Sequence, residues 1–161
     1  MAEARALMTP AGHAQLEAAI KRLLSEERPR VLVELEAARE HGDLTENAEY
    51  HAAKEKLDFI KGKIAELEDK LARAEVIDPK ELKGDSVVFG ATVVLLDAED
   101  DDEKQITYQL VGQDEADVNN GKLNIESPLG RALLGKSEGD EVRVDTPRGI
   151  REYEVVTVRF E

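Results

Sequence analysis

The sequence predicts an α+β protein, with an antiparallel coiled-coil hairpin over residues 1–79 and a sheet-based domain over residues 80–161. The first observation is an apolar pattern with spacings of three and four that runs through the first half. The second is a change of period after "DPKELKGDS", where short β-branched runs begin. A chain of 161 residues can build a core for two small modules.

The first long helix is expected to begin near Pro10, because Thr9 is a good N-cap and proline suits the first helical position. Pro29 removes a helical hydrogen bond, so we expect a kink or a local break there, with the chain continuing in roughly the same direction. The apolar residues that form the packing stripe are Leu16, Ile20, Leu23, Val31, Leu35 and Ala38.

The second long helix shows a heptad seam without a miss. The connection "HGDLTEN" is short, so the two helices are expected to run antiparallel and to pack on each other. The seam residues, in order, are Tyr50, Ala53, Leu57, Ile60, Ile64, Leu67, Leu71 and Ala74.

Two acids, Asp43 and Glu46, stand in the connection at the tip of the hairpin, residues 43–46. In one interpretation Asp43 is the N-cap of the second helix and Glu46 occupies position N3, as in a capping box. In the other, the two carboxylates are half of a Mg²⁺ site, because Mg²⁺ is often held by one or two carboxylates and completed by a partner. The sequence pattern leaves both interpretations open.

Basic and histidine side chains surround the tip. Lys54 and Lys61 share one face of the second helix, where they serve either as surface charge balance or, with Arg39, as a positive strip that contacts RNA. His41 and His51 flank the connection, and polar surface histidines are expected there in preference to a transition-metal site.

The second half reads as strands separated by turn signals. Ser127 as N-cap, Pro128 and Gly135 mark a short helix, in which Gly130 is a small helical penalty. The acidic run "DAEDDDEK" over residues 97–104 is expected to be a solvated hairpin turn. The strand-like runs are "VVFGATVVLL", "QITYQLVG", "KLNIES", "EVRVDTP" and "REYEVVTVRF".

Composition excludes several classes of function. The net charge of −14 opposes autonomous binding to nucleic acid or to an anionic membrane and favours an electropositive partner. With no cysteine, the chain has no disulfide, thiolate metal site or thiol nucleophile. The start lacks a secretory signal pattern, and no segment is apolar for about 18 residues. We therefore expect a cytoplasmic protein with no membrane association.

Four segments together resemble the GreA/GreB family of bacterial transcript cleavage factors, and its GreA type in particular. They are "AREHGDLTENAEYHAAKE", "FGATVVLLD", "VGQDEAD" and "SPLGRALLGKSEGDEV", in the family's order. The resemblance runs from about Met8 to the C-terminus and leaves residues 1–7 as an extension.

The resemblance implies an FKBP-like second domain that docks at the rim of the secondary channel of RNA polymerase, while the coiled coil enters the channel. Asp43 and Glu46 would then help to hold a second Mg²⁺ shared with the polymerase and orient the attacking water. The polymerase itself would cleave backtracked RNA near the 3′ end. The chain would be a monomer, with no nuclease activity alone and only weak or indirect binding to DNA.

The resemblance also assigns expected contacts to further residues, which match the family's functional positions. Arg39 and Lys54 match basic positions that contact the RNA or the polymerase, although many members have arginine where Lys54 stands. Ser127 and Pro128 match the segment that faces the polymerase rim.

Four alternatives remain. A polymerase inhibitor of the same architecture would carry a more acidic tip. A GreB-type factor would have a more basic coiled coil, whereas residues 1–81 carry 13 Lys and Arg against 18 Asp and Glu. An autonomous prolyl isomerase would need an aromatic pocket, and a scaffold or chaperone would use the acids only as caps.

Overall fold

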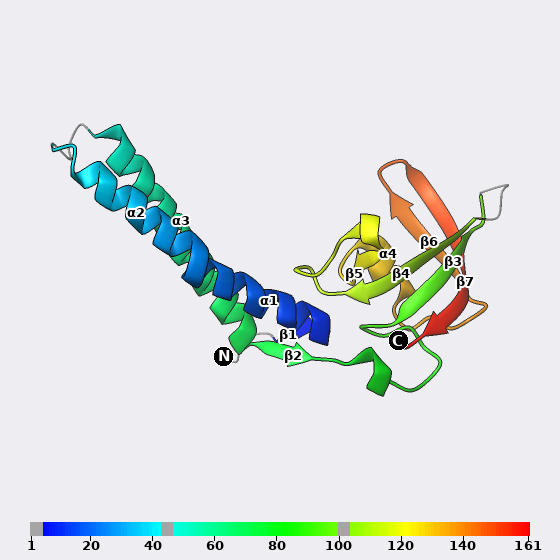
Figure 1. Cartoon of the computed structure of the whole chain (residues 1–161). Helices are drawn as coiled ribbons and strands as arrows, with labels where there is room; N and C mark the ends of the chain where they lie inside the picture. Colours follow the sequence, from blue (N-terminus) through cyan, green and yellow to red (C-terminus); the bar gives the residue numbers. More distant parts are fainter. Residues whose placement is uncertain (1–4, 43–46, 100–103) are drawn as a thin grey trace. The chain divides into compact units, whose positions relative to one another are not determined.

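The computed structural model describes residues 5–42, 47–99 and 104–161 (Figure 1). These residues form two compact units. The first is His13–Ala74, and the second combines Arg5–Gly12 with Glu75–Glu161. The division into domains at residues 79 and 80 stays a prediction. In the described residues, no helix has the length and apolar character needed to cross a membrane.

The first helical rod consists of α1 (Pro10–Arg22), the π-helical segment η1 (Leu23–Glu27) and α2 (Arg28–Arg39). The hydroxyl oxygen of Thr9 accepts a hydrogen bond from the Gly12 N–H at 3.1 Å. Thr9 therefore caps the rod, which begins at Pro10 as the sequence predicts.

The π-helical segment is the local break predicted at Pro29. The Arg28 N–H donates to the carbonyl of Leu23, five residues earlier. Pro29 has no N–H, and in a regular α-helix its ring would crowd the carbonyl of Ser25. A π turn widens the helix at this point, and the backbone at Glu27 and Arg28 keeps right-handed helical angles. The chain therefore continues directly into α2.

Helix α3 (Ala48–Ala72) lies antiparallel to α2 (Figure 1). An ion pair of 3.1 Å between the Lys56 ammonium and the Glu34 carboxylate joins the two helices. The predicted seam is confirmed as far as Leu67, but Ala74 is the first residue of a strand because α3 ends at Ala72. The buried residues of the hairpin core are Val31, Leu35, Ala53, Leu57, Ile60 and Ile64.

Two short strands, β1 (Ala6–Met8) and β2 (Ala74–Val76), pair with each other. The Ile77 N–H donates to the Met8 carbonyl at 2.8 Å, and Met8 is 5% exposed. Ala6 and Leu7, which fall in the expected extension over residues 1–7, thus belong to a strand. Three-residue strands carry too little alternation to be visible in a sequence.

The second unit is built on a curled sheet of five strands in the order β5-β4-β3-β7-β6 (Figure 1). All neighbours are antiparallel except β4 and β5, which are parallel. The strands are β3 (Thr92–Asp97), β4 (Gln105–Val111), β5 (Lys122–Asn124), β6 (Glu141–Thr146) and β7 (Gly149–Arg159).

Short helical elements complete this unit: the 3₁₀ turns η2 (Pro79–Glu81) and η3 (Val118–Asn120), and helix α4 (Pro128–Leu133), which packs on β6. The α+β class is confirmed. The buried core residues are Val87, Ala91, Val93, Leu95, Leu110, Leu123, Leu133, Val142, Val144 and Val155.

The predicted strand that starts at Val87 begins only at Thr92, because Gly90 has a positive φ of 87° and turns the chain. Strands β3 and β4 pair antiparallel, so the acidic run joins a hairpin as expected. Residues 100–103 of this run lie outside the described residues.

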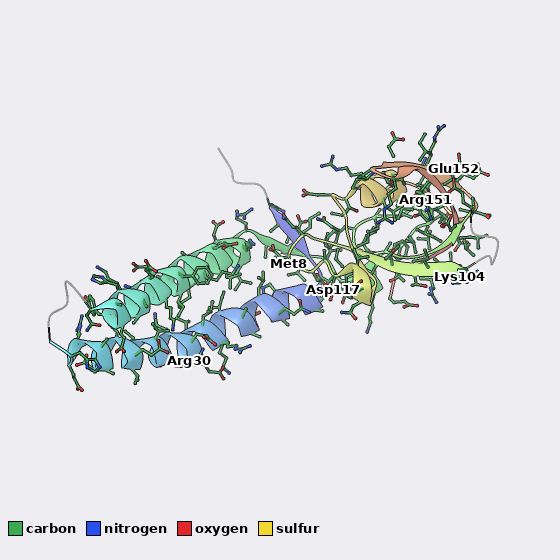
Figure 2. The ribbon with its side chains drawn as sticks, turned by 90° about the horizontal axis from the view of Figure 1, so that it is seen from above. Met8, Arg30, Lys104, Asp117, Arg151 and Glu152 are labelled. Carbon is green, nitrogen blue, oxygen red and sulfur yellow. The ribbon has the colours of Figure 1, made fainter. Side chains whose placement is uncertain are left out.

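An ion pair fixes the end of β3 to β7. The Arg151 guanidinium donates to the Asp97 carboxylate at 2.6 Å, and Arg151 lies on β7 (Figure 2). The Asp97 carboxylate also accepts the Glu99 N–H at 3.0 Å. The Glu99 hydrogen bond and the guanidinium lower the pKa of Asp97, although burial acts in the opposite direction.

Candidate functional site: the end of the helical hairpin

The end of the hairpin lies between the last residue of α2, Arg39, and the first residue of α3, Ala48. The predicted catalytic and metal-binding acids, Asp43 and Glu46, lie outside the described residues. The geometry of the site is therefore defined by the residues on either side of residues 43–46.

Asn47 is the N-cap of α3. Its side-chain oxygen accepts a hydrogen bond from the Tyr50 N–H at 3.1 Å, and its backbone is extended. The interpretation of Asp43 as the N-cap and Glu46 as N3 is wrong, because α3 begins at Ala48. The physical reason is that asparagine is as good an N-cap as aspartate and directly precedes the helix.

The Asn47 side chain also reaches the other helix. Its amide nitrogen donates to the carbonyl oxygen of Ala38, on the last turn of α2, at 2.6 Å. Ala38 is 2% exposed, so this carbonyl has little access to water. This contact was not predicted from the sequence. The asparagine before the periodic residues in "ENAEY" was the available signal for the cap, but no local pattern points to Ala38.

A second contact spans the same end of the hairpin. The His41 Nε2 atom lies 3.5 Å from the Glu49 carboxylate, but both side chains are largely exposed. Such a pair contributes little to stability, because water screens it. The His51 ring meets the Tyr50 ring edge to face. In residues 5–42, 47–99 and 104–161, no group of three or more His, Asp or Glu is arranged to hold a metal ion.

The two predicted basic contact residues are exposed on the two helices that border the tip. Arg39 is on the last turn of α2, where its guanidinium lies 3.9 Å from the Glu36 carboxylate. Lys54 lies on the second turn of α3. Both cations are thus accessible to a partner, and their predicted contacts stay predictions.

Ser127 and Pro128 start helix α4 in the second unit, as the sequence predicts. The Ser127 hydroxyl accepts the Gly130 N–H at 3.1 Å and donates to the Asn124 carbonyl at 2.6 Å. Pro128 is exposed, whereas Ser127 is half-buried. Ser127 therefore has a structural task in addition to its predicted place in a docking surface.

Gly130 was expected to be only a helical penalty, and this is wrong. A Cβ atom at this position would lie 2.3 Å from the Asn124 carbonyl oxygen and 2.9 Å from that of Ile125. Backbone atoms cannot move aside as a flexible side chain can. The close approach of α4 to the end of β5 therefore requires glycine.

The class of the protein follows from comparison with family models. The model "Transcription elongation factor, N-terminal" matches residues 6–76, and "Transcription elongation factor, GreA/GreB, C-term" matches residues 82–160. Each half of the chain thus matches a domain of transcription elongation factors. The match starts at residue 6, where β1 begins, two residues before the start expected from the sequence.

Whole-chain relatives agree with this class. The chain is 60% identical to transcription elongation factor GreA of Cereibacter sphaeroides, over 95% of this chain and 96% of the relative. It is 56% identical to the GreA of Hyphomonas neptunium, with the same two coverages. The chain belongs to the GreA/GreB family of transcription elongation factors.

A solved structure of GreA factor homolog 1 from Thermus thermophilus is also similar. Its sequence is 31% identical, and the match covers 96% of this chain and 99% of that one. The TM-score of the whole-chain superposition is 0.43.

Proposed function

We propose that this protein enters the secondary channel of bacterial RNA polymerase and stimulates the polymerase's own endonucleolytic cleavage of backtracked RNA. The cleavage releases the extruded 3′ end and leaves a new 3′ end that can be extended. The proposal rests on membership of the family, on relatives named transcription elongation factor GreA, and on a long helical hairpin that carries two acids in its connection.

The main structural support for the proposal is that Asn47 is the N-cap of α3. Because Asn47 caps α3, the capping of this helix does not account for Asp43 and Glu46. Their carboxylate oxygens are the hard ligands that Mg²⁺ prefers, so the donor set fits this ion. Two carboxylates alone bind Mg²⁺ weakly, and we therefore propose a site shared with the polymerase.

Asp43 and Glu46 have two tasks in this proposal. They supply oxygen ligands at one side of the shared Mg²⁺, and they accept hydrogen bonds from the attacking water and so orient it toward the phosphodiester. The ion, when bound, activates water and neutralises charge on the phosphate. The remaining ligands and the catalytic centre belong to the polymerase, so the protein alone is not a nuclease.

The basic and docking residues have supporting tasks. Arg39 and Lys54 are exposed beside the tip, where a guanidinium and an ammonium can contact RNA phosphates or acidic groups of the polymerase. We propose that Ser127 and Pro128 present the start of α4 to the rim of the channel. The net charge of −14 favours an electropositive partner surface over free nucleic acid. We also propose that the protein acts as a monomer in the cytoplasm.

The test uses stalled, backtracked polymerase complexes that contain end-labelled RNA. We expect the protein to accelerate the appearance of shortened RNA in the complex, and the shortened RNA to be extended when nucleotides are added. The same RNA incubated with the protein and Mg²⁺, without polymerase, should stay intact. Cleavage of free RNA would overturn the proposed division of labour, and inhibition of cleavage or extension in the complex would favour an inhibitor.

A further inference from the structure

We propose that Asn47 is a positioning residue for the two acids of the tip. Its single side chain links the end of α2 to the start of α3, and residues 43–46 lie between these two points in the sequence. This inference rests on the proposed function, because it assigns Asn47 a task in placing Asp43 and Glu46.

The link consists of two hydrogen bonds made by one amide group. The Asn47 side-chain oxygen accepts the Tyr50 N–H at 3.1 Å, which belongs to the first turn of α3. The Asn47 side-chain nitrogen donates to the Ala38 carbonyl at 2.6 Å, near the end of α2. The first N–H groups and the last carbonyls of helices have no partner within their own helix. Asn47 therefore caps the first turn of α3 and is a second donor to the Ala38 carbonyl, which also accepts the His41 N–H at 3.2 Å.

The surroundings of the link favour a fixed geometry. Ala38 is 2% exposed, and Ala53 on the facing helix is 3% exposed. Hydrogen bonds in such partly buried places compete less with water than bonds at an open surface do. The exposed contact between His41 and Glu49, at 3.5 Å, spans the same end but is open to solvent. Asn47 is thus the better-protected of these two connections.

Capping alone would not require asparagine. Aspartate and serine are about as effective as asparagine at an N-cap, because a cap needs only an acceptor. The contact with Ala38 needs a donor at the end of the same side chain. An ionised aspartate has acceptors only, and serine is shorter and has a single hydroxyl. The two tasks of Asn47 can therefore be separated by substitution.

Positioning matters because catalysis depends on small displacements of the reacting groups. A misplacement of about 1 Å can reduce a rate by about 100-fold. Without the hydrogen bond to the Ala38 carbonyl, the Asn47 side chain no longer joins the end of α2 to the start of α3. Asp43 and Glu46 stand between these two helix ends in the sequence. We expect the maximal cleavage rate to fall, while docking through the second unit stays unchanged.

The experiment compares full-length Asn47→Ser and Asn47→Asp with the wild type in stalled, backtracked polymerase complexes. Both variants keep the cap. Aspartate has no donor for the Ala38 carbonyl, and the serine hydroxyl lies one bond closer to the backbone than the amide nitrogen of asparagine. We expect the cleavage rate at saturating protein to fall by about 5–100-fold, with an unchanged concentration of protein for half-maximal rate. Rates are compared at a temperature at which all variants have the helical circular dichroism of the wild type.

Three further variants complete the design. Glu49→Gln weakens the exposed contact with His41 and should leave the cleavage rate unchanged. Asn47→Ala removes both the cap and the link. If Asn47→Ala is slow while Asn47→Ser and Asn47→Asp equal the wild type, Asn47 is only a cap and the inference is wrong. The third variant, Asp43→Ala with Glu46→Ala, tests the proposed function itself. If it cleaves like the wild type, the proposed function fails, whatever the Asn47 variants do.

Discussion

Glycine has opposite effects at two helical positions of this chain. At Gly130, an added Cβ would lie 2.3 Å from the Asn124 carbonyl oxygen, so the backbone of α4 or β5 would have to move. At Gly62, in the middle of α3, an added Cβ meets no atom within 4 Å apart from its chain neighbours and the backbone of its own helix. Glycine at Gly62 therefore brings only the entropic disadvantage of glycine in a helix.

The first prediction concerns this pair. Gly130→Ala should lower the free energy of unfolding of the second unit by about 1–3 kcal/mol through overpacking. Gly62→Ala should raise the stability of the hairpin by about 0.5–1 kcal/mol. Urea unfolding followed by circular dichroism measures both. Equal effects of the two substitutions would contradict the close approach at Gly130.

The second prediction concerns the pH dependence of stability at Asp97. The pKa of Asp97 is lowered in the folded state. The charged carboxylate therefore contributes to the free energy of unfolding above the unfolded pKa of about 3.9, and this contribution is lost as the pH falls below that value. Asp97→Asn should therefore lower the free energy of unfolding by about 1–2 kcal/mol at pH 7 and by less at pH 3. Urea unfolding at both pH values measures this, and an equal loss at both would contradict the role of the charged form.

At this scale, the sequence predicted some single residues correctly and others wrongly. Thr9 and Ser127 were found as caps, because each directly precedes a proline at the first helical position. Of the two interpretations left open for Asp43, the cap of α3 is wrong, because Asn47 directly precedes this helix and caps it. The need for Gly130 could not be predicted, since it depends on a carbonyl from another element.

Helix α3 shows how an apolar seam distinguishes neighbouring residues. Ile60 is 6% exposed and belongs to the core of the hairpin, whereas Phe59, one position earlier, is 72% exposed. The seam, and not apolar character alone, decides which residue is buried.

The third prediction follows from this contrast. Ile60→Ala should lower the thermal stability of the hairpin and its free energy of unfolding, by about 2–4 kcal/mol, because it removes buried methyl groups and leaves a cavity. Phe59→Ala is the matched control and should change the free energy of unfolding by less than about 0.5 kcal/mol. Differential scanning calorimetry of the two variants checks this. A larger effect at Phe59 would show that the seam is assigned incorrectly.

The elements were largely predictable because their patterns are long. The helices and the later strands follow clear periods, and the break at Pro29 follows from the missing N–H. The sequence could not predict that the break takes the form of a π-helical segment, because a kinked α-helix would also accommodate Pro29. Strands β1 and β2 were missed because three residues do not establish a period.

The whole chain combines segments that are distant in sequence. Arg5–Gly12 belongs to the same compact unit as Glu75–Glu161. Within this unit the Glu115 carboxylate, 9% exposed, accepts the Thr9 hydroxyl at 2.5 Å and the Thr9 N–H at 3.3 Å. Arg5–Gly12 is therefore a structural part of the second unit.

The fourth prediction tests this connection. Glu115→Ala should lower the free energy of unfolding of the second unit by about 1–3 kcal/mol, because it leaves two polar groups of Thr9 without their partner. The exposed Glu126→Ala is the control and should have little effect. Hydrogen exchange of the amides of residues 5–12 and 105–124 reports the loss. Unchanged protection in Glu115→Ala would contradict the connection.

The α+β class of the whole molecule could be predicted from the change of period, and the family from four long segments that include the tip motif. The amide of Asn47 could not be linked to Ala38, because the two residues are nine positions apart on different helices. Long-range pairs of this kind appear only when the elements are packed.

The central claim is that Asp43 and Glu46 act through Mg²⁺ inside the polymerase. The most direct measurement is the cleavage rate of labelled RNA in backtracked complexes as a function of Mg²⁺ concentration, with wild-type protein and with Asp43→Ala plus Glu46→Ala. We expect the wild type to accelerate cleavage and to lower the Mg²⁺ concentration needed for half-maximal cleavage, whereas the variant should bind the polymerase but do neither. Equal rates and equal Mg²⁺ dependence for the two proteins would contradict the account.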